Sequence, residues 1–144
     1  MNNIKLKFKR LTKTAQLPRY AHEGDSGMDI CADEYRLILP HSFAKISTGI
    51  AAIIPDGYEI QVRPRSGMQC FKGIVGAFGT VDTGYRGEIG VALYNHTDSD
   101  YEVKHGDRIA QLVLAPVVRA DIEETDDLGE ETERGTNGFG STGV

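Results

Sequence analysis

The stretch AKISTGIAAIIPDGYEIQVRP, residues 44–64, decides the fold. It holds two apolar runs rich in Ile and Val, Ala44–Ile54 and Tyr58–Arg63, with the turn-forming triplet Pro-Asp-Gly between them. Pro55 and Pro64 each follow the end of a run, where the missing amide hydrogen of proline does least harm to a β-ladder. This pattern predicts β-strands joined by a short turn.

Similar short runs, separated by Gly, Pro and Asp, continue in both directions from this stretch. Ile4, Leu6 and Phe8 alternate with three lysines, which is the period of a half-buried strand. Only Ser66–Lys72 has a helical pattern, of about two turns. The spacing predicts an all-β domain, an antiparallel sandwich or barrel. The other expected strands are Ile4–Lys9, Tyr35–Leu39, Ile74–Val81, Glu88–Tyr94 and Arg108–Val118.

Length, charge and cysteine content restrict the classes of function. At 144 residues the chain is about one domain, and no apolar run reaches the roughly 18 residues that span a bilayer. The net charge of −5 argues against broad nucleic-acid binding. Cys31 and Cys70 form no CxxC pair, so we expect a cytoplasmic protein with both thiols buried and reduced. The histidines show no zinc-ligand spacing.

The last part of the chain differs in composition. From Asp121 to Glu133, eight of thirteen residues are acidic and none is basic, as in a solvated linker. A glycine-rich segment, Arg134–Val144, follows, and a flexible tail is one interpretation of it. The other is an arm that folds over a nucleotide, because Phe139 has no core to enter and glycines let backbone amides approach phosphate oxygens. The side chains beside it that can bind anions are Arg134, Ser141 and Thr142.

Five short segments combine glycine with charged or hydroxyl residues and lie between the expected strands. Each is a weak signal alone, but from Gly24 onward their order and spacing resemble the trimeric dUTP pyrophosphatase (dUTPase) family. The segments are GDSGMDICA (Gly24–Ala32), RPRSGMQ (Arg63–Gln69), GTVDTGYRGEIGVALYN (Gly79–Asn95), GDRIAQLVLAPV (Gly106–Val117) and RGTNGFGSTG (Arg134–Gly143).

The resemblance implies a fold, an assembly and a reaction. The implied fold is a jelly-roll-like β domain over residues 1–122, followed by an acidic linker and a C-terminal arm over residues 123–144. The implied assembly is a homotrimer whose active sites are built from three subunits. The implied reaction is the hydrolysis of dUTP to dUMP and pyrophosphate, with Mg²⁺ as cofactor. We expect no nucleic acid and no membrane among the partners.

The third segment is expected to hold the base and the nucleoside site. The resemblance assigns Asp82 as the general base that activates the attacking water, and a turn-forming Asp before Thr-Gly is the alternative. Tyr85 is expected to lie under the deoxyribose and exclude a 2′-hydroxyl, or else to be an ordinary half-buried strand tyrosine. The residues expected to bind uracil through their backbone groups are Gly79, Thr80, Val81 and Gly90.

The second and first segments are expected to hold the phosphates and the metal. Ser66 would donate to an oxygen near the α–β bridge, with Arg65 and Gly67 beside it, at the start of a short helix. Ser66 as the helix N-cap is compatible with that role. Asp29 would hold Mg²⁺ through bound water, since Mg²⁺ prefers oxygen ligands and keeps several waters.

The fourth and fifth segments complete the expected site. Gln111 resembles a residue that positions the attacking water, and a buried strand Gln bonded to backbone is the alternative. Gly76 departs from the family, in which many members have an Asn that contacts the base through water. The arm residues expected to cover the substrate are Arg134 on the γ-phosphate, Phe139 stacked on uracil, and Gly140, Ser141 and Thr142 over the phosphates.

Two other functions are compatible with part of this pattern. A dCTP deaminase shares the fold but needs a Glu in the strand after the third-segment turn, where this chain has Ala92. A regulatory protein that uses the nucleotide only as a conformational signal is the second alternative. The missing carboxylate at Ala92 argues against deamination, and an intact Asp82 indicates that hydrolysis is retained beside any regulatory role.

Overall fold

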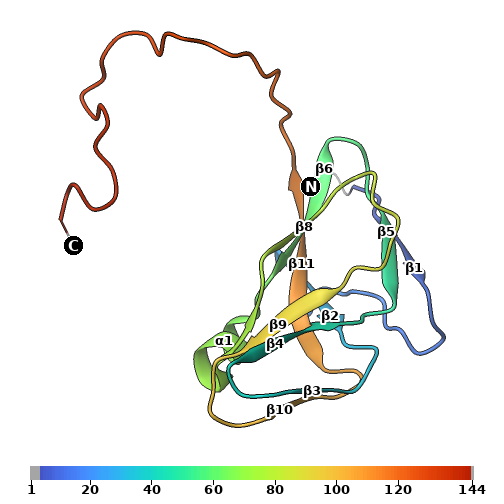
Figure 1. Ribbon diagram of the computed structural model, residues 1–144. Helices are drawn as coiled ribbons and strands as arrows, with labels where there is room; N and C mark the ends of the chain where they lie inside the picture. Colours follow the sequence, from blue (N-terminus) through green and yellow to red (C-terminus); the bar gives the residue numbers. More distant parts are fainter. Residues whose placement is uncertain (1–3, 144) are drawn as a thin grey trace.

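The computed structural model describes residues 4–143, and their regular secondary structure is β-strand except for one short helix (Figure 1). Within these residues no helix has the length and apolar character needed to cross a bilayer. The elements are β1 Lys7–Arg10, β2 Met28–Cys31, β3 Arg36–Ile38, β4 Ser42–Ile46, β5 Ile50–Ile53, β6 Tyr58–Arg63, α1 Ser66–Lys72, β7 Ile74–Gly76, β8 Gly79–Val81, β9 Val91–Asn95, β10 Tyr101–Val103 and β11 Arg108–Pro116.

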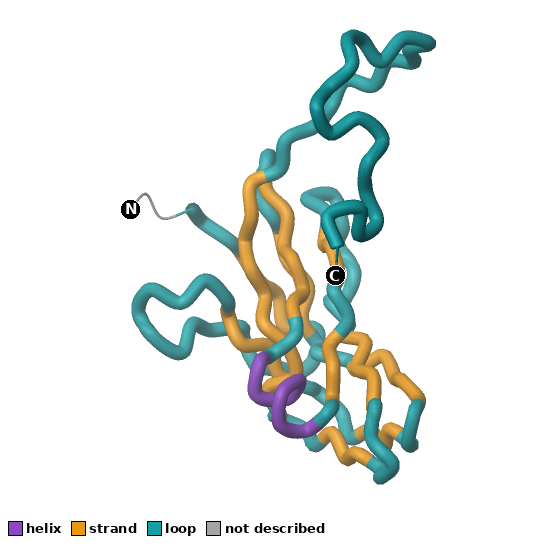
Figure 2. The backbone as a smooth tube through the Cα atoms, turned by 90° about the vertical axis from the view of Figure 1, so that its left-hand side faces the viewer, coloured by secondary structure: helices purple, strands orange, loops and turns teal. Residues whose placement is uncertain are grey.

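The strands form four antiparallel sheets, two of which have only two strands. The largest sheet has the order β2-β11-β6-β8, and a second sheet has the order β4-β9-β7. β1 pairs with β5, and β10 pairs with β3. Figure 2 shows these strands gathered in one β body, with α1 beside its lower half. The expected all-β class is confirmed.

Alternation along the strands builds the core. In β2 the side chains of Met28 and Ile30 are buried, while Asp29 between them is partly exposed. Ile30, Ile60 and Leu112 are fully buried, and burial of a side chain of this size contributes about 1.5–3 kcal/mol. Polar side chains can therefore occupy the outer face of a strand whose inner face is held by the core.

The N-terminal alternation is confirmed in part. Leu6 and Phe8 pack against the core, as the pattern predicts, but Ile4 is exposed. The β1–β5 ladder begins with the pair Lys7 and Ile53, so Ile4, three residues before it, has no strand partner.

The expected single strand Ala44–Ile54 is wrong, because residues 47–49 break it into β4 and β5. Gly49 has a positive φ of 65°, and a Cβ there would lie only 2.6 Å from Oδ2 of Asp33. The backbone N–H groups of Thr48 and Gly49 leave the ladder and donate to Oε1 of Glu88, at 3.2 and 2.7 Å. The apolar character of the run did not predict this break, because the break depends on hydrogen bonds from two backbone amides to a carboxylate that is distant in the sequence.

The expected strand Ile74–Val81 also divides, into β7 and β8, because its two halves join different sheets. β7 pairs with β9, whereas β8 pairs with β6. Two observed strands are absent from the expected set. β2 lies in a glycine-rich segment, and β10 has only three residues.

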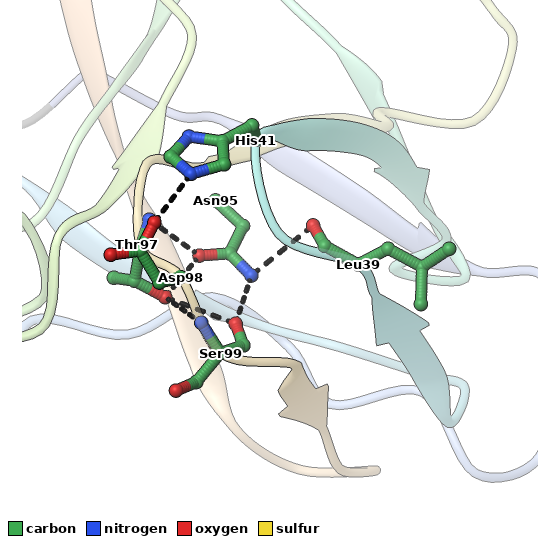
Figure 3. Close-up of polar contacts among 6 residues, drawn as sticks. All are labelled: Leu39, His41, Asn95, Thr97, Asp98 and Ser99. Atoms are coloured by element: carbon green, nitrogen blue, oxygen red, sulfur yellow. Dashed lines mark hydrogen bonds and ion pairs between the residues drawn. The ribbon is translucent and has the colours of Figure 1, made fainter.

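A buried amide, Asn95, ties three segments together. Its Nδ2 donates to the backbone carbonyls of Ile38, Leu39 and Ser99, at 3.0, 3.2 and 2.8 Å. Its Oδ1 accepts hydrogen bonds from the backbone N–H and the hydroxyl of Thr97 (Figure 3). Because the buried amide is fully paired, the turn after β9 is fixed against the end of β3.

The chain leaves the β body after β11. The N–H of Val117 still donates to the carbonyl of Gly57 at 2.9 Å, and residues 118–143 form neither helix nor strand. Figure 1 shows this segment extending away from β11 and curling back on itself. Phe139 is fully exposed within it. A division of the chain at residue 122 stays a prediction.

A nearly buried carboxylate, Asp33, joins further segments of the β body. Its side chain is 5% exposed, and its oxygens pair with the hydroxyl of Thr12 and, at 2.9 Å, with Nε2 of His105. Its backbone N–H donates to the carbonyl of Ser47 at 2.8 Å. Burial alone would raise the pKa of Asp33, but the hydrogen bonds from Thr12, Thr14 and His105 outweigh burial and hold this pKa below its usual value.

We expect Asp33→Asn to destabilise the fold at neutral pH and to have little effect in strong acid. A lowered folded pKa means that the contribution of the carboxylate is complete above the ordinary Asp pKa of about 3.9. That contribution is lost as the pH falls through the lower folded value. Loss of hydrogen bonds to a charged group should reduce the free energy of unfolding by roughly 1.5–3 kcal/mol at neutral pH. Urea unfolding at neutral pH and at about pH 2 measures the difference.

Asp98→Asn is the matched control for this substitution. Asp98 also pairs with a histidine, His41, at 2.7 Å, but its side chain is 97% exposed. Exposed pairs contribute little to stability, so Asp98→Asn should leave unfolding unchanged. Equal destabilisation by Asp33→Asn at both pH values would contradict the charge-based explanation.

Candidate functional site

A cavity of about 370 Å³ lies between β8, the turn after it and β9. We call it the hairpin pocket, where hairpin means the loop of residues 82–90 between β8 and β9; these two strands pair with other strands and not with each other. It brings together six of the residues predicted from the sequence, namely Gly79, Thr80, Val81, Asp82, Tyr85 and Gly90. The remaining lining residues are Lys45, Val62, Glu88, Ile89 and Ala92.

Asp82 lies directly after the last residue of β8, at the strand-to-turn junction that the sequence predicts. The turn is held by the backbone, since the N–H of Tyr85 donates to the carbonyl of Asp82 at 3.0 Å. The hydroxyl of Thr83 anchors it to the carbonyl of Ile54 at 2.8 Å. The carboxylate of Asp82 is exposed and forms no hydrogen bond with any residue in 4–143, so it is free to act on a ligand.

Tyr85 closes one side of the hairpin pocket and does not lie in a strand, so the strand-tyrosine alternative is wrong. Its hydroxyl donates to the backbone carbonyl of Glu88 at 2.9 Å. A side chain at Gly87 would collide with this hydroxyl, so the glycine lets the ring fold back over the hairpin. The position of the ring is therefore set within the hairpin itself.

A second cavity, of about 360 Å³, lies beside the start of α1. We call it the arginine pocket. It contains the predicted residues Asp29, Arg65, Ser66, Gly67 and Gln111. The other lining residues are Ala21, His22, Asp25, Ser26, Gly27 and Arg108.

Asp29 lies between two arginines in the arginine pocket. Its Oδ1 pairs with Nε of Arg65 at 3.0 Å, and its Oδ2 pairs with Arg108 at 3.4 Å. The carboxylate is only 16% exposed, so these pairs hold both guanidinium groups at the cavity. The motif GDRIAQL contains Arg108, but its role was not predicted, because nothing in the sequence alone places the start of β11 beside Asp29.

Gln111 lies at the centre of the largest sheet. On β11 it is opposite Asp29 of β2 on one side and Arg63 of β6 on the other. Its Nε2 donates to the backbone carbonyl of Pro64 at 3.0 Å, as the alternative interpretation predicts, although the side chain is only half-buried. A Cβ at Gly27 would collide with Oε1 of Gln111. Gly27 therefore leaves room for the side chain of Gln111 where the first segment approaches β11.

The N-cap residue of α1 is not the serine that the sequence analysis considered. Arg65, not Ser66, is the N-cap residue, and it has extended backbone angles and no side-chain capping bond. Ser66 is the first helical residue, and within residues 4–143 its exposed hydroxyl forms no hydrogen bond. The N-cap interpretation of Ser66 is wrong, and the hydroxyl faces the arginine pocket without a partner.

The two cysteines take no part in either pocket. Cys31 is half-buried, but Cys70 is exposed on α1, so the prediction of a buried thiol is wrong for Cys70. Burial, and then the negative charge of Asp29, raise the pKa of the Cys31 thiol. This thiol therefore stays protonated at neutral pH and is a poor nucleophile.

The predicted site residues do not meet within one chain. The hairpin pocket and the arginine pocket have no residue in common. The predicted arm residues line neither of them and surround a hollow of their own. Asp82 thus lines a different cavity from Arg65, and the arm residues line neither of these two cavities. The arm residues concerned are Arg134, Phe139, Gly140, Ser141 and Thr142.

The family model for dUTPase matches residues 13–143 of this chain. The chain belongs to the dUTPase family. Two relatives named deoxyuridine 5′-triphosphate nucleotidohydrolase match it over nearly their full length. The relative from Picosynechococcus sp. is 51% identical over 96% of this chain and 99% of its own length. The relative from Clostridium tetani is 46% identical over 99% of both chains.

Solved dUTPase structures have the same fold. The dUTPase of Staphylococcus bacteriophage 80alpha with dUPNHPP matches with a TM-score of 0.92 at 30% identity, over 99% of this chain and 100% of that chain. A dUTPase variant from phage phi11 of S. aureus, which coordinates a structural Mg(II) ion, has a TM-score of 0.81 at 26% identity, over 87% of this chain and 99% of that chain.

The dUTPase chain supplies few ligands of its own for a metal. Within residues 4–143 no group of three or more His, Cys, Asp or Glu side chains is arranged to hold an ion. The arginine pocket offers the carboxylates of Asp29 and Asp25, and Asp25 already accepts the N–H of His22 at 2.8 Å. Such a donor set fits a Mg²⁺ ion that keeps its waters and takes its other ligands from phosphates.

We expect Gly27→Ala to displace the side chain of Gln111 and to lower dUTP turnover by up to about 10²-fold, because misplacement by about 1 Å has effects of that size. The measurement is steady-state turnover of Gly27→Ala, Gln111→Ala and the double variant. Since both substitutions act through the same side chain, the double variant should match Gln111→Ala alone. Independent, multiplicative losses would show that the two residues are not coupled.

Proposed function

We propose that the hairpin pocket of one chain and the arginine pocket of a neighbouring chain form one active site in a homotrimer. The chain hydrolyses dUTP to dUMP and pyrophosphate, as its membership of the dUTPase family shows. This reaction needs a base near the α-phosphorus and cations around the phosphates. Asp82 and the arginines lie in pockets without a common residue, and this observation carries the proposal.

Asp82 is the general base of the proposed site. Its uncommitted carboxylate lines the hairpin pocket and accepts a proton from a water at hydrogen-bond range. The oxygen of that water bonds to the α-phosphorus as the bond from this phosphorus to the bridging oxygen breaks. Pyrophosphate leaves with the electron pair. Gln111 positions the water from the arginine pocket.

The arginine pocket binds the phosphates. Arg65, Ser66 and Gly67 provide donors at the start of α1, and Arg108 adds a second guanidinium. In the free chain both guanidinium groups are held by Asp29. A bound triphosphate offers them charge-assisted hydrogen bonds, which are about twice as strong as neutral ones.

Mg²⁺ is the proposed cofactor, with Asp29 as an outer ligand through water. When bound, Mg²⁺ would neutralise phosphate charge and hold the triphosphate in one conformation. Support comes from the position of the Asp29 carboxylate between the two arginines of the pocket, with Asp25 as the other carboxylate of its lining, a donor set suited to outer-sphere binding.

Residues 123–144 are proposed to form a linker and an arm that closes the site, while residues 1–122 form the β domain. Arg134 binds the γ-phosphate, Phe139 stacks on the uracil, and Gly140, Ser141 and Thr142 cover the phosphates. The full exposure of Phe139 in the free chain supports this role, because an aromatic ring gains most from a partner when it has no core to enter.

The hairpin pocket is proposed to select the nucleoside. Backbone groups of Gly79, Thr80, Val81 and Gly90 pair with uracil, and the ring of Tyr85 leaves no room for a 2′-hydroxyl. The fixed position of this ring, whose hydroxyl is bonded to the carbonyl of Glu88, supports the second part. A tyrosine ring that is held in one position excludes the 2′-hydroxyl of a ribose better than a mobile ring does.

The two alternative functions have less support. Ala92 lines the hairpin pocket and places no carboxylate at the position where a deaminase needs one. A phage dUTPase that resembles this chain is described as controlling the transfer of virulence genes, so a regulatory role accompanies the fold in that protein. The free carboxylate of Asp82 favours hydrolysis here.

We expect Asp82→Asn to keep the fold and nucleotide binding while turnover falls by about 10²-fold or more, because the amide cannot accept the proton. Turnover of dUTP and binding of a non-hydrolysable analogue are the two measurements. Near-normal turnover would remove Asp82 from the mechanism.

Mixing two inactive variants tests whether the two pockets come from different chains. Asp82→Asn and Arg65→Ala chains, unfolded and refolded together, should regain part of the activity, since some sites then combine an intact Asp82 with an intact Arg65. Each variant refolded alone is the control. Without recovery in the mixture, both halves belong to one chain and the shared site is wrong.

Deletion of residues 134–144 should leave thermal unfolding unchanged, because residues 134–143 contribute no strand or helix to the β body. Turnover should fall by about 10²-fold through loss of closure over the site. Phe139→Ala should lower turnover in the same direction, whereas Leu128→Ala, at an equally exposed apolar residue of the linker, should not. Full activity of the truncated chain would identify the segment as an ordinary disordered tail.

A further inference from the structure

We propose that Lys45 makes the hairpin pocket prefer a base with a 4-keto group over a base with a 4-amino group. The inference rests on the proposed function, in which this pocket holds the base. Lys45 lies on β4, outside all five sequence segments, yet it lines the pocket. It is the one cation among the lining residues of this pocket that the structure describes.

The β4–β9 ladder places Lys45 in the wall of the pocket. Lys45 is paired with Ala92, so the two side chains lie side by side on the same face of the sheet. Ala92 also lines the pocket. The stem of the lysine crosses Gly90, since a Cβ at that position would collide with Cε of Lys45. The absence of a side chain at residue 90 is what admits the lysine.

This position is at the base end of the pocket. In the proposed substrate orientation, Asp82 and Tyr85 act on the sugar and the adjoining phosphate, and both lie at the turn of the hairpin. Gly90 pairs with uracil in that orientation, and the Lys45 stem packs against Gly90. The ammonium group therefore faces the edge of the base.

The ammonium group has no competing partner in the described part of the chain. No ion pair in residues 4–143 involves Lys45. Of the two carboxylates in the pocket, that of Glu88 already accepts the N–H groups of Thr48 and Gly49. The carboxylate of Asp82 lies at the turn.

The chemistry of the two pyrimidines gives the direction of the preference. An ammonium group has three donors and no acceptor. A 4-keto group accepts a hydrogen bond, whereas the 4-amino group of cytosine is itself a donor. Lys45 therefore gains a charge-assisted bond with uracil and meets an unpaired donor with cytosine. Lys45 is exposed in the free chain, so its ammonium group loses water when the base enters the pocket. A base that offers no acceptor then leaves this charged group without a partner, which discriminates against cytosine.

The test compares dUTP with dCTP as substrates of the full-length wild-type protein, Lys45→Met, Lys45→Arg and Lys7→Met. Lys45→Met keeps the apolar stem, Lys45→Arg keeps the donors, and Lys7→Met removes an exposed lysine from β1. We expect Lys45→Met to reduce the dUTP-to-dCTP ratio of kcat/KM by about 10- to 100-fold, mainly through KM for dUTP. Lys45→Arg and Lys7→Met should keep most of the preference. An unchanged ratio in a folded Lys45→Met protein would overturn the inference.

Binding of dUMP distinguishes a contact with the base from a contact with the distal phosphates. Calorimetry with dUMP and with a non-hydrolysable dUTP analogue should show the same fold-loss in Lys45→Met, since both ligands carry the uracil. A loss confined to the triphosphate would overturn the inference in favour of phosphate binding. Failure of the wild-type protein to prefer dUTP over dCTP would instead contradict the proposed function of the pocket.

Discussion

Strand β11 pairs with β2 along one edge and with β6 along the other, and the arginine pocket depends on the register of both ladders. Gln111 is opposite Asp29 in one ladder and Arg63 in the other. Because side chains alternate between the faces of a strand, a slip by one residue would turn Gln111 inward and bring Leu112 to the pocket. The buried apolar residues of β11 prevent this slip, so the core fixes the polar site.

The hairpin pocket depends in the same way on Glu88. Its carboxylate accepts hydrogen bonds from the two backbone N–H groups between the end of β4 and the start of β5. Its backbone carbonyl accepts a hydrogen bond from the hydroxyl of Tyr85. One residue thus connects the break in a strand with the position of an aromatic ring. Lys45 lies shortly before that break on β4, so the wall that carries it is held by the same contacts.

The sequence predicted well those features that follow from local pattern. β6 and α1 have the predicted bounds, and Asp82 lies at the predicted turn. Two apolar runs that we expected as single strands are each divided into two. In both, a distant group changes the pairing, as Glu88 does for residues 47–49. The roles of Arg108 and Lys45 went unpredicted for a related reason. Each acts beside a residue far away in the chain, and only the ladders bring them together.

The separation of the hairpin pocket from the arginine pocket has a consequence for how the protein behaves at low concentration. If the halves meet only between chains, a dissociated chain turns over nothing, even one that keeps both cavities. On dilution the total activity would then fall more steeply than the amount of protein, so the specific activity would fall too. Added substrate would partly restore it by bridging the chains. Removal of dUTP would then become efficient only above a threshold concentration of the protein.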